Sequence, residues 1–126
     1  MGERPDALTG VVAIAIDCID PPQLAEFWQR LLGGTVIVDD DGDARLQVAD
    51  LLPLDFLRAP DPRSVKNRLH LDIGSTDYDR AVEQALALGA TRADDVYDGD
   101  RWQVLRDPEG NEFCILRHGG EAFDVY

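Results

Sequence analysis

Residues 14–34 read IAIDCIDPPQLAEFWQRLLGG, and this stretch decides the fold. Together with the three apolar residues before it, its first part is rich in β-branched side chains, which predicts a strand over 11–18. Asp20 followed by Pro21 is typical of a helix start with Asp as the N-cap. Leucine and aromatic side chains then recur at helical spacing until Gly33. The stretch therefore predicts a strand followed by a helix over 21–32.

The same pattern returns about 57 residues later, as an internal repeat. Asp20 corresponds to Asp77 and Gly33 to Gly89, so residues 68–73 (RLHLDI) predict a second strand and residues 77–88 a second helix. Three strand candidates follow each helix. In the first half they lie at 35–38, 45–48 and 54–57, and in the second half one weaker strand lies within 91–97 and two more lie at 102–105 and 112–116. We therefore predict an α+β fold of two tandem βαβββ modules that form a curved mixed sheet with a cleft.

The repeat also predicts the domain organisation. We expect residues 1–126 to form a single domain, with module 1 at about 10–59, a linker at 60–67 and module 2 at about 68–117. A module of roughly 57 residues is marginal as a separate domain. The two modules should therefore pack together about a pseudo-twofold axis.

Charge and composition exclude several function classes. The chain carries 25 acidic and 12 basic residues, a net charge of −13. This balance argues against nucleic-acid binding and against an anionic membrane surface, and it mildly favours neutral or cationic ligands. No apolar run approaches membrane-spanning length, and the polar N-terminus shows no secretion signal. We expect a cytoplasmic protein with a small-molecule ligand, in which Cys18 and Cys114 are buried free thiols.

Strand side chains alternate between two faces, which sorts the candidate site residues. We expect the larger apolar side chains of the first strand of each module to pack under the helices. These are Val12, Ile14, Ile16, Leu69, Leu71 and Ile73. The opposite face then carries the candidate site residues Asp17, Leu57, His70, Asp72 and Cys114. Parity does not settle which face Trp102 takes.

The two halves resemble the vicinal oxygen chelate superfamily, which includes glyoxalase I, bleomycin-resistance proteins and extradiol dioxygenases. The resemblance is closest to bacterial glyoxalase-like domain proteins. It is carried by IAIDCIDPPQLAEFWQRLLGG, by KNRLHLDI at 66–73 and by DPEGNEFCIL at 107–116. It implies the paired-module fold over residues 11–116. It does not imply one reaction, because the superfamily includes isomerases, lyases, transferases, dioxygenases and binding proteins.

The resemblance also implies where a metal would sit. Metal-dependent members carry a His on the first strand of each half and a carboxylate or similar ligand on the last, positions that here hold Ala13, Leu57, His70 and Cys114. Only His70 has the expected ligand type. A divalent ion needs several convergent donors, so we predict no bound metal and no other cofactor. Cys114, with Asp17 or Asp72, remains chemically able to contribute to a zinc site.

We predict that His70 and Asp72 are the catalytic residues, because a carboxylate beside an imidazole fixes its tautomer for acid/base chemistry. The predicted substrate-binding residues are Asp17, Leu57, Trp102 and Cys114. The alternatives are structural: His70 as a relic of an ancestral site, the two Asp residues paired with Arg68 or Arg101, and Cys114 as an inert thiol.

The leading functional hypothesis is a glyoxalase-like protein that binds a small molecule in its cleft, as a metal-independent enzyme of lyase or isomerase type without an assigned substrate. One alternative is a non-enzymatic protein that sequesters a cationic, drug-like compound. The other is a metal-dependent lyase or dioxygenase. We also expect a homodimer, because paired-module proteins commonly bury sheet edges or helix faces against a second chain.

Overall fold

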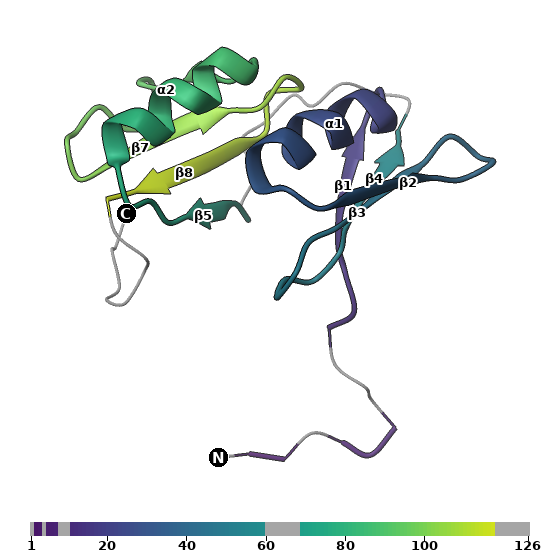
Figure 1. Ribbon diagram of the computed structural model, residues 1–126. Helices are drawn as coiled ribbons and strands as arrows, with labels where there is room; N and C mark the ends of the chain where they lie inside the picture. The colour runs from purple at the N-terminus through teal and green to yellow at the C-terminus, as the bar shows by residue number, and fades with distance from the viewer. Residues whose placement is uncertain (1, 4, 8–10, 60–68, 118–126) are drawn as a thin grey trace. The chain divides into compact units, whose positions relative to one another are not determined.

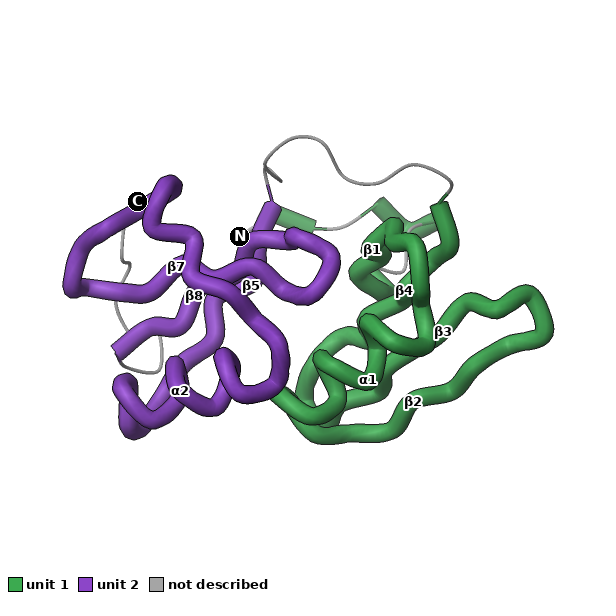
Figure 2. The backbone as a smooth tube through the Cα atoms, turned by 90° about the horizontal axis from the view of Figure 1, so that it is seen from above, with its two compact units in different colours: residues 1–61 green, residues 62–126 purple. Residues whose placement is uncertain are grey.

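The computed structural model describes residues 2–3, 5–7, 11–59 and 69–117 (Figure 1). The chain divides into two compact units, Met1–Asp61 and Pro62–Tyr126, called unit 1 and unit 2 below (Figure 2). Each unit contains one strand, one helix and three further strands in chain order. The predicted linker over 60–67 lies outside the described residues.

Unit 1 is a four-stranded mixed sheet with one helix packed on it (Figure 1). Its elements are β1 (Ile14–Cys18), α1 (Pro21–Leu32), β2 (Thr35–Val38), β3 (Ala44–Gln47) and β4 (Leu54–Arg58). The strand order is β1-β4-β3-β2. The first strand pairs in parallel with the last, whereas the other pairs are antiparallel.

Unit 2 repeats this topology. Its elements are β5 (Leu71–Ile73), α2 (Tyr78–Leu88), β6 (Thr91–Arg92), β7 (Trp102–Arg106) and β8 (Glu112–Leu116). The order β5-β8-β7-β6 again places the first strand in parallel beside the last. The α+β class and the two βαβββ modules are thereby confirmed, with the described strands forming two four-stranded sheets.

The helix ends follow the sequence signals. The side chain of Asp20 accepts a hydrogen bond from the Gln23 backbone N–H at 3.2 Å, and Asp77 does the same for Arg80. Satisfying these N–H groups stabilises the first turn of each helix. The buried face of α1 packs on its own sheet through Leu24, Ala25, Phe27 and Trp28. Neither described helix is long and apolar enough to cross a membrane.

The start of the first strand and the packing of Val12 and Leu69 were predicted wrongly. The first strand begins at Ile14, not at residue 11, and Val12 is 70% exposed instead of packed under the helix. Its ladder with β4 starts at Leu54, and Pro53 has no N–H to extend it. Leu69 is likewise 88% exposed and precedes β5. Residues 91–97 do contain a short strand, as predicted. It ends at Arg92, and the Ala93 carbonyl then accepts turn hydrogen bonds from Val96 and Tyr97.

An ion-pair network crosses one end of the unit 2 sheet. The Arg106 guanidinium contacts Glu112 at 3.2 Å and Asp95 at 2.7 Å. Glu112 is buried, with a side chain only 2% exposed, whereas Asp95 is exposed. The hydrogen bond from Arg106 holds the pKa of Asp95 below its usual range. Arg106 therefore neutralises a buried carboxylate on the last strand of the module.

The glycine pair after α1 provides a test of the chain reversal. Gly33 and Gly34 both have positive φ, +79° and +98°, which disfavours any side chain. A Cβ at Gly33 would meet nothing within 4 Å, whereas one at Gly34 would collide with the Gln47 carbonyl oxygen of β3. Gly33→Ala should cost about 1 kcal/mol of unfolding free energy, and Gly34→Ala clearly more. Urea unfolding measures both, and equal losses would contradict this close approach.

The buried Glu112 gives a second prediction. Arg106→Ala leaves a buried carboxylate without its cation, so it should lower the unfolding free energy by about 3 kcal/mol. The matched control is Arg30→Ala, which removes a 4.0 Å pair with Glu26 whose side chains are both 64% exposed, and it should cost less than about 0.5 kcal/mol. Adding Glu112→Gln to Arg106→Ala should restore part of the loss. A harmless Arg106→Ala would show that Glu112 is not stabilised by this pair.

Candidate functional site

The candidate site forms where β5 lies beside β8. Asp72 is directly opposite Cys114 in this parallel ladder, and Cys114 is opposite Val104 in the antiparallel ladder with β7. Ladder partners project to the same side of a sheet, so these three residues share one face. The register of the first and last strands thus brings residues 42 positions apart in the chain into contact.

Three side chains with proton- or metal-binding groups meet on this face. His70 Nδ1 lies 3.2 Å from Asp72 Oδ1. A His70 nitrogen, an Asp72 carboxylate oxygen and Cys114 Sγ all lie within 4.8 Å of one another. We call these three residues the unit 2 cluster. The Asp72 and His70 side chains are 39% and 22% exposed, and Cys114 is 2% exposed, so the cluster runs from the surface into the sheet.

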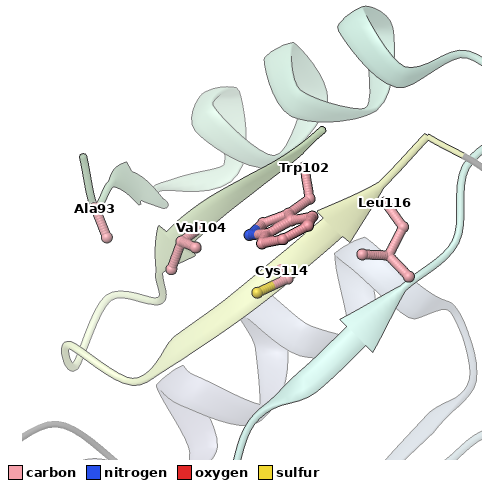
Figure 3. Packing of buried hydrophobic residues seen from close by; sticks show 5 residues of the cluster. All are labelled: Ala93, Trp102, Val104, Cys114 and Leu116. Carbon is pink, nitrogen blue, oxygen red and sulfur yellow. The ribbon is translucent and has the colours of Figure 1, made fainter. Parts of the chain in front are cut away.

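Apolar side chains surround the thiol. Cys114 packs in a buried group with Ala93, Trp102, Val104 and Leu116 (Figure 3). Trp102 is opposite Leu116 in the β7–β8 ladder, which places it on the face of Cys114 and answers the question that parity left open. Its ring stacks on Tyr97 with centroids 4.4 Å apart. Trp102 is only 2% exposed, so it contributes a wall beneath the cluster.

Two predicted site residues belong to unit 1. Asp17 is exposed and lies opposite the half-buried Leu57 in the β1–β4 ladder. Nearby on β4, Asp55 forms a two-bond ion pair with Arg45, at 2.6 and 2.8 Å. The hydrogen bond from Arg45 lowers the pKa of Asp55. Thus Asp17 and Leu57 are neighbours in one unit, whereas His70, Asp72, Cys114 and Trp102 gather in the other.

The resemblance placed Cys114 and His70 in one set of implied ligand positions, but reasoning from the residues alone did not bring them together. That reasoning placed both on one face but found no base beside the thiol, because strand parity does not give the register between two strands. Sequence reasoning also missed Tyr97, which stacks on Trp102, and the pairing of Arg106 with Glu112 two residues from Cys114. Arg68, one expected partner of the Asp side chains, lies outside the described residues. Within the described part of unit 2, Asp72 contacts His70.

The donor chemistry of the cluster partly fits a divalent metal ion. Imidazole nitrogen, carboxylate oxygen and thiolate sulfur are all zinc ligands, and three protein ligands are the usual number at catalytic zinc sites. The side chains of Ala13 and Leu57, at the other two positions that the resemblance implied, have no donor atom. Of the four implied positions only His70 and Cys114 carry a donor atom, and Asp72 adds a third donor to the cluster.

Solved structures with the same fold come from several bacteria. A glyoxalase/bleomycin resistance protein/dioxygenase family enzyme from Burkholderia phytofirmans is 22% identical, with a TM-score of 0.65, over 82% of this chain and 94% of that one. The fosfomycin resistance protein FosX from Mesorhizobium loti is 12% identical, with a TM-score of 0.68, over 86% and 91%. A FosX variant from Listeria monocytogenes, complexed with Mn(II) and 1S,2S-dihydroxypropylphosphonic acid, is 17% identical, with a TM-score of 0.68, over 90% and 94%.

These likenesses establish the fold alone, because their identities are low. No curated protein sequence matches the chain. The sequence profile described as "Glyoxalase-like domain" matches residues 13–116, which include both described sheets and the unit 2 cluster. The chain therefore belongs to the glyoxalase-like domain family, within the glyoxalase/bleomycin resistance/dioxygenase fold.

Proposed function

We propose that this protein binds a small organic molecule and acts on it as a lyase- or isomerase-type enzyme, by proton transfer at His70 without a metal ion. The 3.2 Å contact between His70 Nδ1 and Asp72 Oδ1 is the observation that carries the proposal. When Nδ1–H donates to the carboxylate, Nε2 carries the lone pair of the ring that accepts a proton. Asp72 then holds the ring in one tautomer and stabilises the imidazolium that forms.

The surroundings of the pair suit this chemistry. His70 is partly exposed, so a substrate proton is able to reach its ring, while the apolar group around Cys114 excludes water from the other side. In this proposal Trp102 and Cys114 contact the substrate beside His70 in unit 2. The substrate-binding role predicted for Asp17 and Leu57, which lie in unit 1, stays a prediction. The related Listeria FosX structure, with a small dihydroxy phosphonic acid, supports a small polar ligand for this fold.

The proposed setting of the protein follows from its sequence. We propose a cytoplasmic homodimer with no nucleic-acid or membrane partner, in keeping with the net charge of −13. Light scattering at micromolar concentration tests the dimer, and a monomer there would contradict it.

A metal-dependent lyase or dioxygenase is the second candidate, favoured by the convergence of Cys114 on the same pair. An ion held by the cluster would supply a Lewis acid that polarises a substrate oxygen. His70 would then be a ligand and would not carry a proton. The two candidates therefore assign opposite roles to the same imidazole.

The proposed acid/base role predicts a large effect of His70→Gln. Hits from a thermal-shift screen of small polar and cationic organic compounds would be incubated with chelator-treated protein in D₂O and followed by NMR. We expect hydrogen–deuterium exchange or product formation with at least one hit. His70→Gln should slow it by about 10²- to 10⁴-fold, the usual contribution of a general acid or base. Asp72→Asn should slow it less, because it leaves the imidazole in place.

The control is Glu26→Gln, on the exposed face of α1, which should leave the rate unchanged. Circular dichroism and thermal midpoints check that every variant is folded. Turnover that requires an added metal ion would favour the second candidate. Binding of a hit without exchange or product would instead support a non-enzymatic binding protein.

A further inference from the structure

We propose that Cys114 is a nucleophile that His70 activates, and that its thiol binds small uncharged α,β-unsaturated carbonyl compounds covalently. This inference goes beyond the proposed function, in which His70 exchanges a proton with the substrate and Cys114 only contacts it. The product is a thioether on the protein itself. The reaction therefore needs neither turnover nor a second reactant.

The three side chains of the unit 2 cluster are arranged as a nucleophile, a base and a group that orients the base. Cys114 Sγ, a His70 nitrogen and an Asp72 carboxylate oxygen lie within 4.8 Å of one another. His70 Nδ1 contacts Asp72 Oδ1 at 3.2 Å. A base held by a third group beside a thiol is the arrangement that activates cysteine nucleophiles, and its contacts are often loose before the substrate binds. When Nδ1–H donates to Asp72, the other ring nitrogen is the one that accepts the thiol proton.

The two cysteines of the chain differ in their neighbours and not in their burial. Cys114 is 2% exposed and Cys18 is 4% exposed. The group of His, Cys, Asp and Glu side chains that the described residues form contains Cys114 but not Cys18. The ladder partner of Cys18 is Arg58, a cation that cannot accept a thiol proton. Cys18 therefore serves as an internal control that matches Cys114 in depth.

The surroundings of the thiol select the class of ligand. An ion would lose its hydration at a large cost beside the apolar group that packs around Cys114 (Figure 3), and the net charge of −13 repels anions. Sulfur is a soft nucleophile that adds readily to the polarised double bond of a conjugated carbonyl compound. The compound must also be small, because the buried thiol is approached past the partly exposed side chains of His70 and Asp72.

The reaction balances with the groups that the cluster holds. His70 takes the proton from the Cys114 thiol, and the sulfur forms a bond to the β-carbon of the double bond. The π electrons move toward the carbonyl group as an enolate, and the His70 imidazolium returns the proton to the α-carbon. One S–H bond and one C=C π bond are replaced by a C–S and a C–H bond. No group leaves, so the mass of the protein rises by the full mass of the ligand.

Methyl vinyl ketone is the probe, because it is among the smallest uncharged compounds of this class. The full chain is incubated with it in the presence of a chelator, and peptide mass spectrometry follows the adduct on each cysteine over time. Cys114 should react much faster than Cys18. His70→Gln should slow the reaction of Cys114 by about 10²-fold or more, as loss of a general base does, and leave the rate of Cys18 unchanged. Asp72→Asn should slow Cys114 less, because the imidazole stays in place.

Loss of folding cannot imitate this result. A variant that opens more often exposes both thiols and therefore reacts faster, not slower. A maleimide that carries a polyethylene glycol chain measures such opening, because it is too large to reach a buried thiol in the folded chain. It should modify Cys114 and Cys18 at similarly slow rates in the wild type. Preferential reaction of Cys114 with this large reagent would contradict the selection for small compounds.

Two outcomes would overturn the activated thiol. One is equal reaction of Cys114 and Cys18 with methyl vinyl ketone in the wild type, and the other is an unchanged rate of Cys114 in His70→Gln. The proposed function fails separately. Adduct formation without any His70-dependent exchange or product would contradict that function and support the nucleophile, whereas exchange without the adduct would overturn the nucleophile alone.

Discussion

The parallel pairing of the first and last strands is the constraint on which each unit depends. A parallel neighbour requires a crossover, and here the crossover contains the helix and the middle strands of the module. The pairing closes each module around its buried phenylalanine, Phe56 in β4 and Phe113 in β8. It also fixes which side chains meet, since Asp17 is held against Leu57 and Asp72 against Cys114.

Much of this architecture could be predicted, because its signals are local. The caps at Asp20 and Asp77 and the glycines after each helix act within one turn of the chain, and the helices begin and end within one residue of the prediction. The errors at Val12 and Leu69 have a different cause. Both residues have strand-forming neighbours, but a strand ends where its partner ends, and that partner lies far away in the sequence.

The site was harder to predict for the same reason. Alternation along one strand indicates that His70 and Asp72 share a face, and their 3.2 Å contact agrees with that pattern. No pattern within one strand gives the register between β5 and β8. If β8 were shifted along β5, a residue other than Cys114 would lie beside Asp72. Trp102 shows this limit most clearly, because its face became known only from its pairing with Leu116.

The two cysteines show how register, not burial, assigns chemistry in this fold. Cys18 and Cys114 are nearly equally buried. Each belongs to the parallel pair of first and last strands in its own module, Cys18 on β1 and Cys114 on β8. Cys18 is opposite Arg58, whereas Cys114 is opposite Asp72 and near an imidazole. The two thiols are therefore buried to a similar extent, but one lies opposite a cationic residue and the other opposite an acidic residue. The ladder hydrogen bonds do not depend on the side chains that face each other, so the same strand pairing is compatible with different residues in the two modules.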